Sequence, residues 1–170
     1  TFSEKDKKDI VIKLANTKNE KNISNLAEKN AKQALKQRLI QSDSNNNLIE
    51  ELAKKFNINN NIELIEVYDN SHIQGTDSVG SLICFGNEGF VKKRYRKFNI
   101  KNEKIKNDDY GMMKEVLFRR FSKAIKEKSG SLSLPDLIMI DGGKGQYSVS
   151  RETLNELGLH DLPILAVAKG

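Results

Sequence analysis

The strongest fold signal in the chain is the segment PDLIMIDGGKGQ at residues 135–146. Four consecutive apolar residues at 137–140 predict a short strand that is buried on both faces of a sheet. Asp141 follows this strand directly, and the glycines after it turn the chain into a helix at about 146–157. Residues 163–167 then begin a last strand. The segment therefore predicts an α/β fold in which helices pack on a sheet.

Upstream of this segment the period of the apolar residues changes from two to three or four. Residues 62–68, 79–85 and 90–100 are rich in branched and aromatic side chains, and their short connections favour an antiparallel meander. Residues 108–128 carry one apolar face and one basic face, as expected of a long amphipathic helix. The chain thus predicts a mixed sheet, with three antiparallel strands and then parallel strands, flanked by helices.

An asparagine-rich run at 57–61 marks a boundary in the chain. We expect an N-terminal extension of a strand and helices at 1–60, leading into a catalytic domain at 61–170. Within the extension we expect a strand at 10–14 and helices at 23–40 and 47–56, separated by a polar break at 42–47.

Composition narrows the class of protein. The chain has 170 residues, one cysteine and a net charge of +6. No apolar run approaches the roughly 18 residues that span a bilayer, and a single cysteine excludes an internal disulfide framework. We therefore expect a cytoplasmic protein with no membrane partner. Eight basic residues against Glu103 alone at 92–106 favour nucleic acid as the partner.

Carboxylates recur at the ends of the expected elements. Asp69 ends the first strand of the catalytic region, Asp108 and Asp109 open the long helix, and Asp141 ends the buried strand. Two carboxylates about 5 Å apart repel by roughly 3 kcal/mol at an effective dielectric near 20, so a converging trio calls for a divalent cation. Taken singly, Asp108 is more often a helix cap, and Asp141 before two glycines can simply shape a turn.

Several motifs, in order along nearly the whole chain, resemble the UvrC family of the bacterial nucleotide-excision-repair excinuclease. The segment at 135–146 is similar to the family's Pro-Asp-Leu-Ile-Leu-Ile-Asp-Gly-Gly-Lys-Gly-Gln. The others are VYDNSHIQGT at 67–76, DDYGMM running on to LFRRF at 108–121, AVAKG at 166–170, and AEKNA at 27–31, which resembles the segment just before the family's catalytic domain.

This resemblance implies a ribonuclease-H-like endonuclease domain that cuts the damaged strand on the 5′ side of a lesion. The family's acidic triad maps onto Asp69, Asp109 and Asp141, which would hold Mg²⁺ or Mn²⁺, and Asp108 is then the helix cap. The implied partners are damaged double-stranded DNA and, through parts of the full protein that are not in this chain, UvrB. Asn70 stands where the family usually has an apolar residue, with no expected consequence for the acids.

The resemblance also implies that the chain is a fragment, truncated at its C-terminus. The family has a further active-site histidine downstream of the last segment seen here, so we expect the isolated chain to be weakly active or inactive. Neither His72 nor His160 can be assigned as that histidine. We expect His72 to support the site or the fold rather than to act directly, and His160 to lie on the surface.

Basic side chains near these motifs are candidates for contact with the DNA backbone. Lys144 lies on the glycine turn, where backbone N–H groups can hold a phosphate, although the spacing is not that of a nucleotide-binding P-loop. A tight turn and a solvated basic face are the alternatives. The full set of candidates is Lys144, Arg119 and Arg120, with Lys92, Arg94 and Arg96 at alternate positions of the third strand.

Two other functions remain open at the level of sequence. One is a catalytically incomplete module of the same fold that binds DNA or acts as a scaffold. The other is a different ribonuclease-H-like nuclease, acting on RNA–DNA hybrids or in transposition. Binding of Mn²⁺ discriminates the first from an active nuclease, and the substrate discriminates the second.

Overall fold

The computed structural model of the chain describes residues 14–58, 61–73, 77–100, 105, 108–127 and 133–168. Its contacts divide the chain into two compact units, residues 1–40 and residues 41–170. The predicted strand at 10–14 falls almost entirely outside the described residues.

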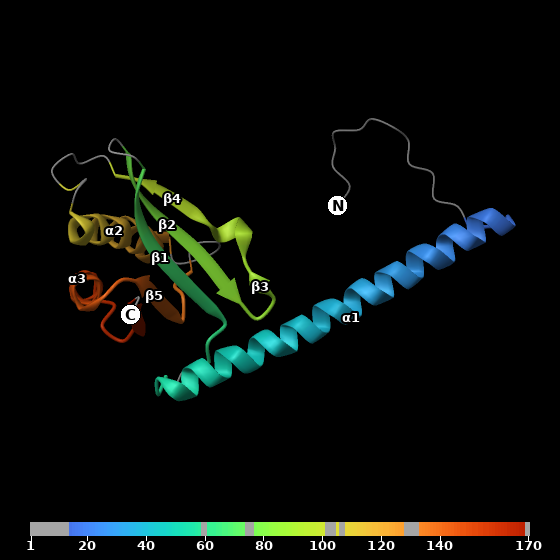
Figure 1. Cartoon of the computed structure of the whole chain (residues 1–170), viewed down its shortest axis with the longest axis horizontal. Helices are drawn as coiled ribbons and strands as arrows, with labels where there is room; N and C mark the ends of the chain where they lie inside the picture. The colour runs from blue at the N-terminus through green and yellow to red at the C-terminus, as the bar shows by residue number, and fades with distance from the viewer. Residues whose placement is uncertain are drawn as a thin grey trace. The chain divides into compact units, whose positions relative to one another are not determined.

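The first helix, α1, is continuous from Lys18 to Lys55, so the polar break predicted at 42–47 is wrong (Figure 1). The helix begins with a capping box, in which Thr17 Oγ1 accepts from the Glu20 N–H at 3.3 Å and Glu20 Oε2 accepts from the Thr17 N–H at 3.0 Å. No described helix, α1 included, is long and apolar enough to cross a membrane.

Tertiary contacts keep α1 helical through the polar run. Asn45 is buried and donates its side-chain amide to the Asn87 carbonyl at 3.3 Å, and Ile49 is buried one turn later. The run contains neither glycine nor proline, so the weak helix propensity of its Ser and Asn residues is the only term against the helix. Packing outweighs that term.

A six-stranded mixed sheet forms the centre of the second unit, as predicted (Figure 1). The strand order is β3-β2-β1-β5-β6, with β4 also paired to β2; β1 pairs antiparallel with β2 and parallel with β5, and β5 pairs parallel with β6. The strands are β1 Leu64–Ile73, β2 Asp77–Gly86, β3 Gly89–Phe90, β4 Arg96–Asn99, β5 Leu137–Asp141 and β6 Ile164–Val167.

The third predicted strand, 90–100, is interrupted. A 3₁₀ turn, η1, spans Lys92–Arg94 between β3 and β4. The Arg94 N–H donates to the Val91 carbonyl at 2.9 Å and the Tyr95 N–H donates to the Lys92 carbonyl at 3.1 Å, which turns the backbone out of the ladder. Lys92, Arg94 and Arg96 therefore do not alternate along one strand, and that expectation is wrong.

Strand β1 extends beyond its predicted end. It pairs with β2 from Leu64 to Ile73, but its pairing with β5 covers only Ile65 to Tyr68. Asp69 is consequently not the end of a strand. It is the first residue of β1 past the stretch that pairs with β5.

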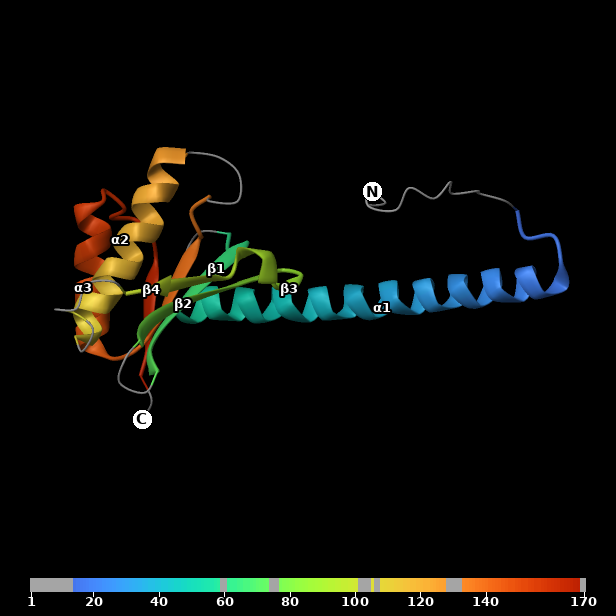
Figure 2. The same cartoon turned by 90° about the horizontal axis from the view of Figure 1, so that it is seen from above.

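Two helices, α2 at Asp109–Glu127 and α3 at Lys144–Glu156, cover one face of the sheet (Figure 2). The other face carries a smaller core in which Ile49 of α1 packs with Ile62, Ile65 and Leu137. Because α1 contributes Ile49 to this core, the second compact unit, residues 41–170, includes the end of α1. The main core consists chiefly of Tyr68, Leu82, Met112, Met113, Val116, Leu117, Phe121, Ile138, Ile140 and Leu154.

Candidate active site

Two of the three predicted acids lie on neighbouring parallel strands. The last printed pair of the β1–β5 ladder joins Tyr68 and Ile140, so Asp69 and Asp141 are the next residues on each strand. Tyr68 and Ile140 point into the main core, and side chains alternate along a strand. Asp69 and Asp141 therefore project from the opposite face of the sheet, where Asp69 is exposed and Asp141 is half-buried.

The third acid, Asp109, is the first residue of α2 and is exposed. Asp108 precedes it as the helix cap, because its Oδ1 accepts from the Tyr110 N–H at 3.1 Å and its carbonyl accepts from the Met112 N–H at 2.8 Å. The expected division of labour within this pair of acids is confirmed for Asp108.

Asn70 links the first strand to the start of α2. Its side-chain Nδ2 donates to the backbone carbonyl of Asp109 at 3.3 Å. Asn70, which follows Asp69, thus makes a hydrogen bond to the backbone of Asp109, the third acid. The expectation that Asn70 has no consequence for the acids is not tested by this contact, which is to the backbone of Asp109 and not to its carboxylate.

Tyr110 links the start of α2 to the glycine turn after Asp141. A Cβ atom built on Gly145 would collide with the Tyr110 ring and hydroxyl, so the Tyr110 side chain packs directly against this glycine. Together with the β1–β5 ladder and the Asn70 contact, this packing joins all three acid-bearing segments to one another.

The segments meet, but among the described residues no three His, Cys, Asp or Glu side chains are grouped so as to hold a metal ion. The donor set still suits a hard divalent cation, because Mg²⁺ is commonly held by one or two carboxylates, with waters and substrate phosphate completing the shell. Asp69 and Asp141 supply two such carboxylates from adjacent strand positions.

The glycine turn opens α3, of which Lys144 is the first and an exposed residue. Gly142 has φ +156°, and a Cβ there would meet the Gln146 side chain at 2.7 Å. The Gly143 N–H donates to Gln146 Oε1 at 3.2 Å. One of the backbone donors expected to face a phosphate is therefore already engaged within the turn.

Arg120 does not lie where the sequence analysis expects it. The residue is buried at 5% exposure and pairs with Glu66, Nη2 to Oε1 at 2.6 Å. It also donates to the Ser133 carbonyl at 2.9 Å, and the Tyr68 hydroxyl donates to Glu66 Oε2 at 2.6 Å. This position does not fit contact with DNA, and Arg120 is left out of any proposed DNA surface.

The other basic candidates are dispersed. Arg119 is on the surface of α2, where it pairs with Glu115 at 3.0 Å and donates to the Asn99 carbonyl at 2.9 Å. Lys92 and Arg96 are exposed, and the Arg96 guanidinium donates to two backbone carbonyls of its own turn.

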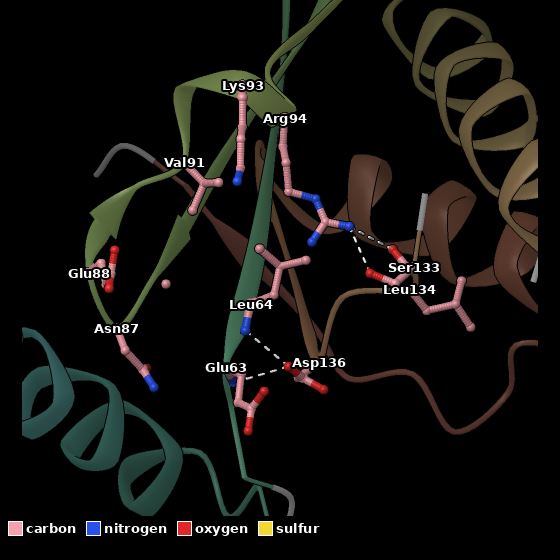
Figure 3. Close-up of a pocket in the computed structure, with 11 residues that line it drawn as sticks. Glu63, Leu64, Asn87, Glu88, Val91, Lys93, Arg94, Ser133, Leu134 and Asp136 are labelled. Atoms are coloured by element: carbon pink, nitrogen blue, oxygen red, sulfur yellow. Dashed lines mark hydrogen bonds between the residues drawn. The ribbon is translucent and has the colours of Figure 1, made fainter. Parts of the chain in front are cut away.

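Arg94 points into a pocket of about 480 Å³ that opens beside the first residues of β1 (Figure 3). Its Nη2 donates to Ser133 Oγ at 2.7 Å and to the Ser133 carbonyl at 3.4 Å. The pocket also contains Asp136, whose Oδ2 accepts from the backbone N–H groups of Glu63 and Leu64. None of the three acids of the candidate site lines it.

The two histidines lie in different parts of the fold. His72 is a residue of β1, and its side chain lies outside the described part of the structure. His160 lies in the connection between α3 and β6 and is exposed, as predicted, and its carbonyl accepts from Arg151 at 3.0 Å.

Sequence reasoning missed the residues that join the segments. Asn70 offered a signal, since asparagine is depleted in strands and its presence beside Asp69 calls for a specific contact. Arg120 offered another, because it falls in register with Val116 and Ala124 on the buried stripe of α2. Tyr110 and Gly145 offered none, because their contact depends on how α2 and α3 pack.

The mixed sheet, its strand order and the helices that cover it are those of a ribonuclease-H-like fold. A family model described as the UvrC RNAse H endonuclease domain matches residues 53–170. The chain belongs to that family.

Three relatives, each named UvrABC system protein C, illustrate the likeness. The protein of Hyphomonas neptunium is 52% identical over 149 residues, covering 85% of this chain and 24% of its own length. The protein of Cereibacter sphaeroides is 49% identical over 147 residues, with 85% and 24% covered, and that of Ruegeria sp. is 44% identical over 172 residues, with 99% and 27% covered. The chain thus spans about a quarter of the length of these relatives.

Among solved structures, human ENDOV matches with a TM-score of 0.45 and 16% sequence identity. The match covers 64% of this chain and 46% of that one.

Proposed function

We propose that this chain is the part of an excision-repair nuclease that cuts the damaged DNA strand on the 5′ side of a lesion, with the help of Mg²⁺ or Mn²⁺. The observation that carries the proposal is the meeting of the three acid-bearing segments, β1 at Asp69, the start of α2 at Asp109 and the end of β5 at Asp141. Family membership supports the nuclease chemistry.

In this proposal Asp69 and Asp141 hold the cation just past the last β1–β5 pair, and Asp109, the first residue of α2, adds a third carboxylate at that same end of the ladder, from across the sheet. When bound, such an ion supplies Lewis-acid activation of water and of the phosphoryl oxygens in an in-line displacement. Lys144, exposed at the start of α3, pairs with a backbone phosphate, and the partial positive charge of the helix N-terminus adds to that attraction.

The test is the Asp141→Asn substitution in a full-length parent protein supplied with its partner proteins and a lesion-bearing duplex. We expect the 5′ cut to be abolished and the 3′ cut to remain, because a neutral amide cannot replace a carboxylate as a ligand to a hard cation. Asp161→Asn is the matched control, since Asp161 is exposed on the connection between α3 and β6. An unchanged 5′ cut in the Asp141 variant removes Asp141 from the site.

The damaged duplex and UvrB, reached through other parts of the full protein, belong to the same proposal. Besides Arg119, which pairs with Glu115, the exposed candidates for contact with the DNA backbone are Lys92, Arg96 and Lys144. Replacing all three by alanine should weaken DNA binding and make it less sensitive to salt, since fewer counterions are released. Undiminished binding with an unchanged salt dependence would remove these residues from the DNA surface.

A second candidate, a DNA-binding or scaffolding module without catalysis, is favoured by one observation. No three potential metal ligands are grouped among the residues that the structure describes. Calorimetry with Mn²⁺ separates the two candidates: a nuclease site binds the ion and raises the melting temperature, because the ligand binds the native state, whereas a scaffold does neither.

A further inference from the structure

Asn70 lies where the strand and the helix of the candidate site meet. It follows Asp69 in β1, and the alternation of the strand turns it to the face that α2 covers, on the same side as Tyr68. Its Nδ2 donates to the carbonyl of Asp109 at 3.3 Å. One side chain therefore joins the backbone segments of two of the three acids.

The strand beside Asn70 is shaped to admit this contact. Gly80 is its partner across the β1–β2 ladder, and a Cβ on Gly80 would collide with Val116 of α2 and come within 3.2 Å of Asn70 Oδ1. Without a side chain at position 80, α2 packs close to the sheet at this point. The Asn70 amide then spans the remaining distance to the first residue of the helix.

The orientation of the amide costs stability. Asn70 Oδ1 is buried and has no hydrogen-bond partner in the described part of the molecule. An amide flipped the other way would set Oδ1 against the Asp109 carbonyl, so the contact with α2 and the unpaired oxygen come together. A buried acceptor without a partner is unfavourable, and an apolar side chain of similar size would avoid it.

We propose, on the basis of the function proposed above, that Asn70 is a positioning residue that fixes Asp109 relative to Asp69. It contacts neither the substrate nor an ion. It acts through the backbone of Asp109, by holding the first turn of α2 against the strand that carries Asp69. Its role lies in the geometry of the metal ligands, and the fold does not require it.

The test compares two substitutions that remove the same kind of bond. Asn70→Leu keeps the size of the side chain and removes the amide. Asn45→Leu is the matched control, because Asn45 also donates Nδ2 to a backbone carbonyl at 3.3 Å, that of Asn87, away from the acids. Both are made in the chain described here and measured by thermal melting and by calorimetric titration with Mn²⁺, with Asp141→Asn titrated alongside.

We expect Asn70→Leu to weaken Mn²⁺ binding by about tenfold, as is typical when a support of a metal ligand is lost, without lowering the melting temperature. Asn45→Leu should lower the melting temperature and leave Mn²⁺ affinity unchanged. Asn70→Ala provides the same metal comparison if the leucine does not fit.

Two outcomes overturn the proposal while the metal site stands. In one, the Asn70 variants bind Mn²⁺ as tightly as the parent while Asp141→Asn does not. In the other, Asn70→Leu and Asn45→Leu lose stability and affinity alike, which would make Asn70 an ordinary structural contact. If the parent and Asp141→Asn bind Mn²⁺ equally, the proposed metal site itself fails, and the role of Asn70 fails with it.

Discussion

Adjacent arginines on α2 have opposite environments. Arg119 lies on the surface with its guanidinium 5.6 Å from the centre of the Phe98 ring, whereas Arg120 is buried against Glu66. The two arginines look alike as members of a basic cluster in the sequence. The helical period distinguishes them, because only Arg120 falls on the buried stripe of α2. A charge on an apolar stripe predicts a buried partner, and the identity of that partner depends on tertiary packing.

Replacing Arg120 by alanine should lower the free energy of unfolding by about 3–5 kcal/mol, since Glu66 is left as an uncompensated buried charge. The matched change Arg119→Ala should cost no more than about 1 kcal/mol, because its ion pair is exposed to solvent. Urea denaturation followed by circular dichroism measures both. Equal losses in the two variants would mean that the Glu66–Arg120 pair is not buried in solution.

Cys84 makes a prediction about pH. Burial, reinforced by the nearby Glu66 carboxylate, raises the pKa of the Cys84 thiol from 9.0 to about 11. The unfolded chain therefore releases this proton at a lower pH than the folded chain, and stability that is complete below about pH 9 is lost as the pH rises to about 11. Urea midpoints measured from about pH 8 to about pH 10.5 should fall, and should fall less steeply in Cys84→Ala.

The same burial protects the thiol from reagents. In the folded chain Cys84 should react slowly with a thiol-specific dye at neutral pH, because both access and ionisation are suppressed. Rapid labelling before unfolding would contradict the buried position of Cys84 in β2.

Among the elements, the locally encoded ones were predictable. Strand β5 and helices α2 and α3 follow from an unbroken apolar run, a helical period and a glycine turn, each readable within a few residues. The errors fall where distant contacts decide. The polar run in α1 stays helical because Asn45 and Ile49 are buried by other segments, and the third strand breaks into a turn at Lys92–Arg94.

The glycine turn between β5 and α3 should tolerate substitution unevenly. Gly142→Ala should lower the free energy of unfolding by about 1–3 kcal/mol, because φ +156° suits glycine and the added methyl meets Gln146. Gly143→Ser is the control, since nothing lies within 4 Å of a Cβ there and serine is a favoured helix N-cap. Thermal melts should show a loss for the first variant and none for the second. A Gly142→Ala variant that melts at the same temperature as the parent would contradict this conformation of the turn.

At the scale of the whole molecule, the sequence picks out three candidate acids, but how their segments meet depends on strand pairing. In the sequence, Asp69, Asp109 and Asp141 stand out because each is predicted near the end of an element. Asp69 and Asp141 occupy neighbouring strand positions because β1 pairs with β5, and the segment of Asp109 meets theirs through Asn70 and Tyr110. Such long-range contacts leave no local pattern in the sequence.

The boundary of the compact unit can be tested by shortening the chain. A variant beginning at Gln41 keeps Ile49 over Ile62, Ile65 and Leu137, and should unfold in one cooperative transition. A variant beginning at residue 61 uncovers that apolar surface and should melt at a lower temperature or aggregate. Calorimetry on the two variants decides between them. Equal stability would move the boundary back toward residue 60.

The parallel pairing of β1 with β5 also bears on biosynthesis. Ile65 cannot find Leu137 until nearly all of the domain has left the ribosome, because the partners are far apart in the chain. A nascent polypeptide that is still being translated at α2 has Asp69 and Asp109 but no neighbouring β5. A half-made copy of this domain therefore lacks the β1–β5 pairing that brings Asp69 and Asp141 to neighbouring strand positions.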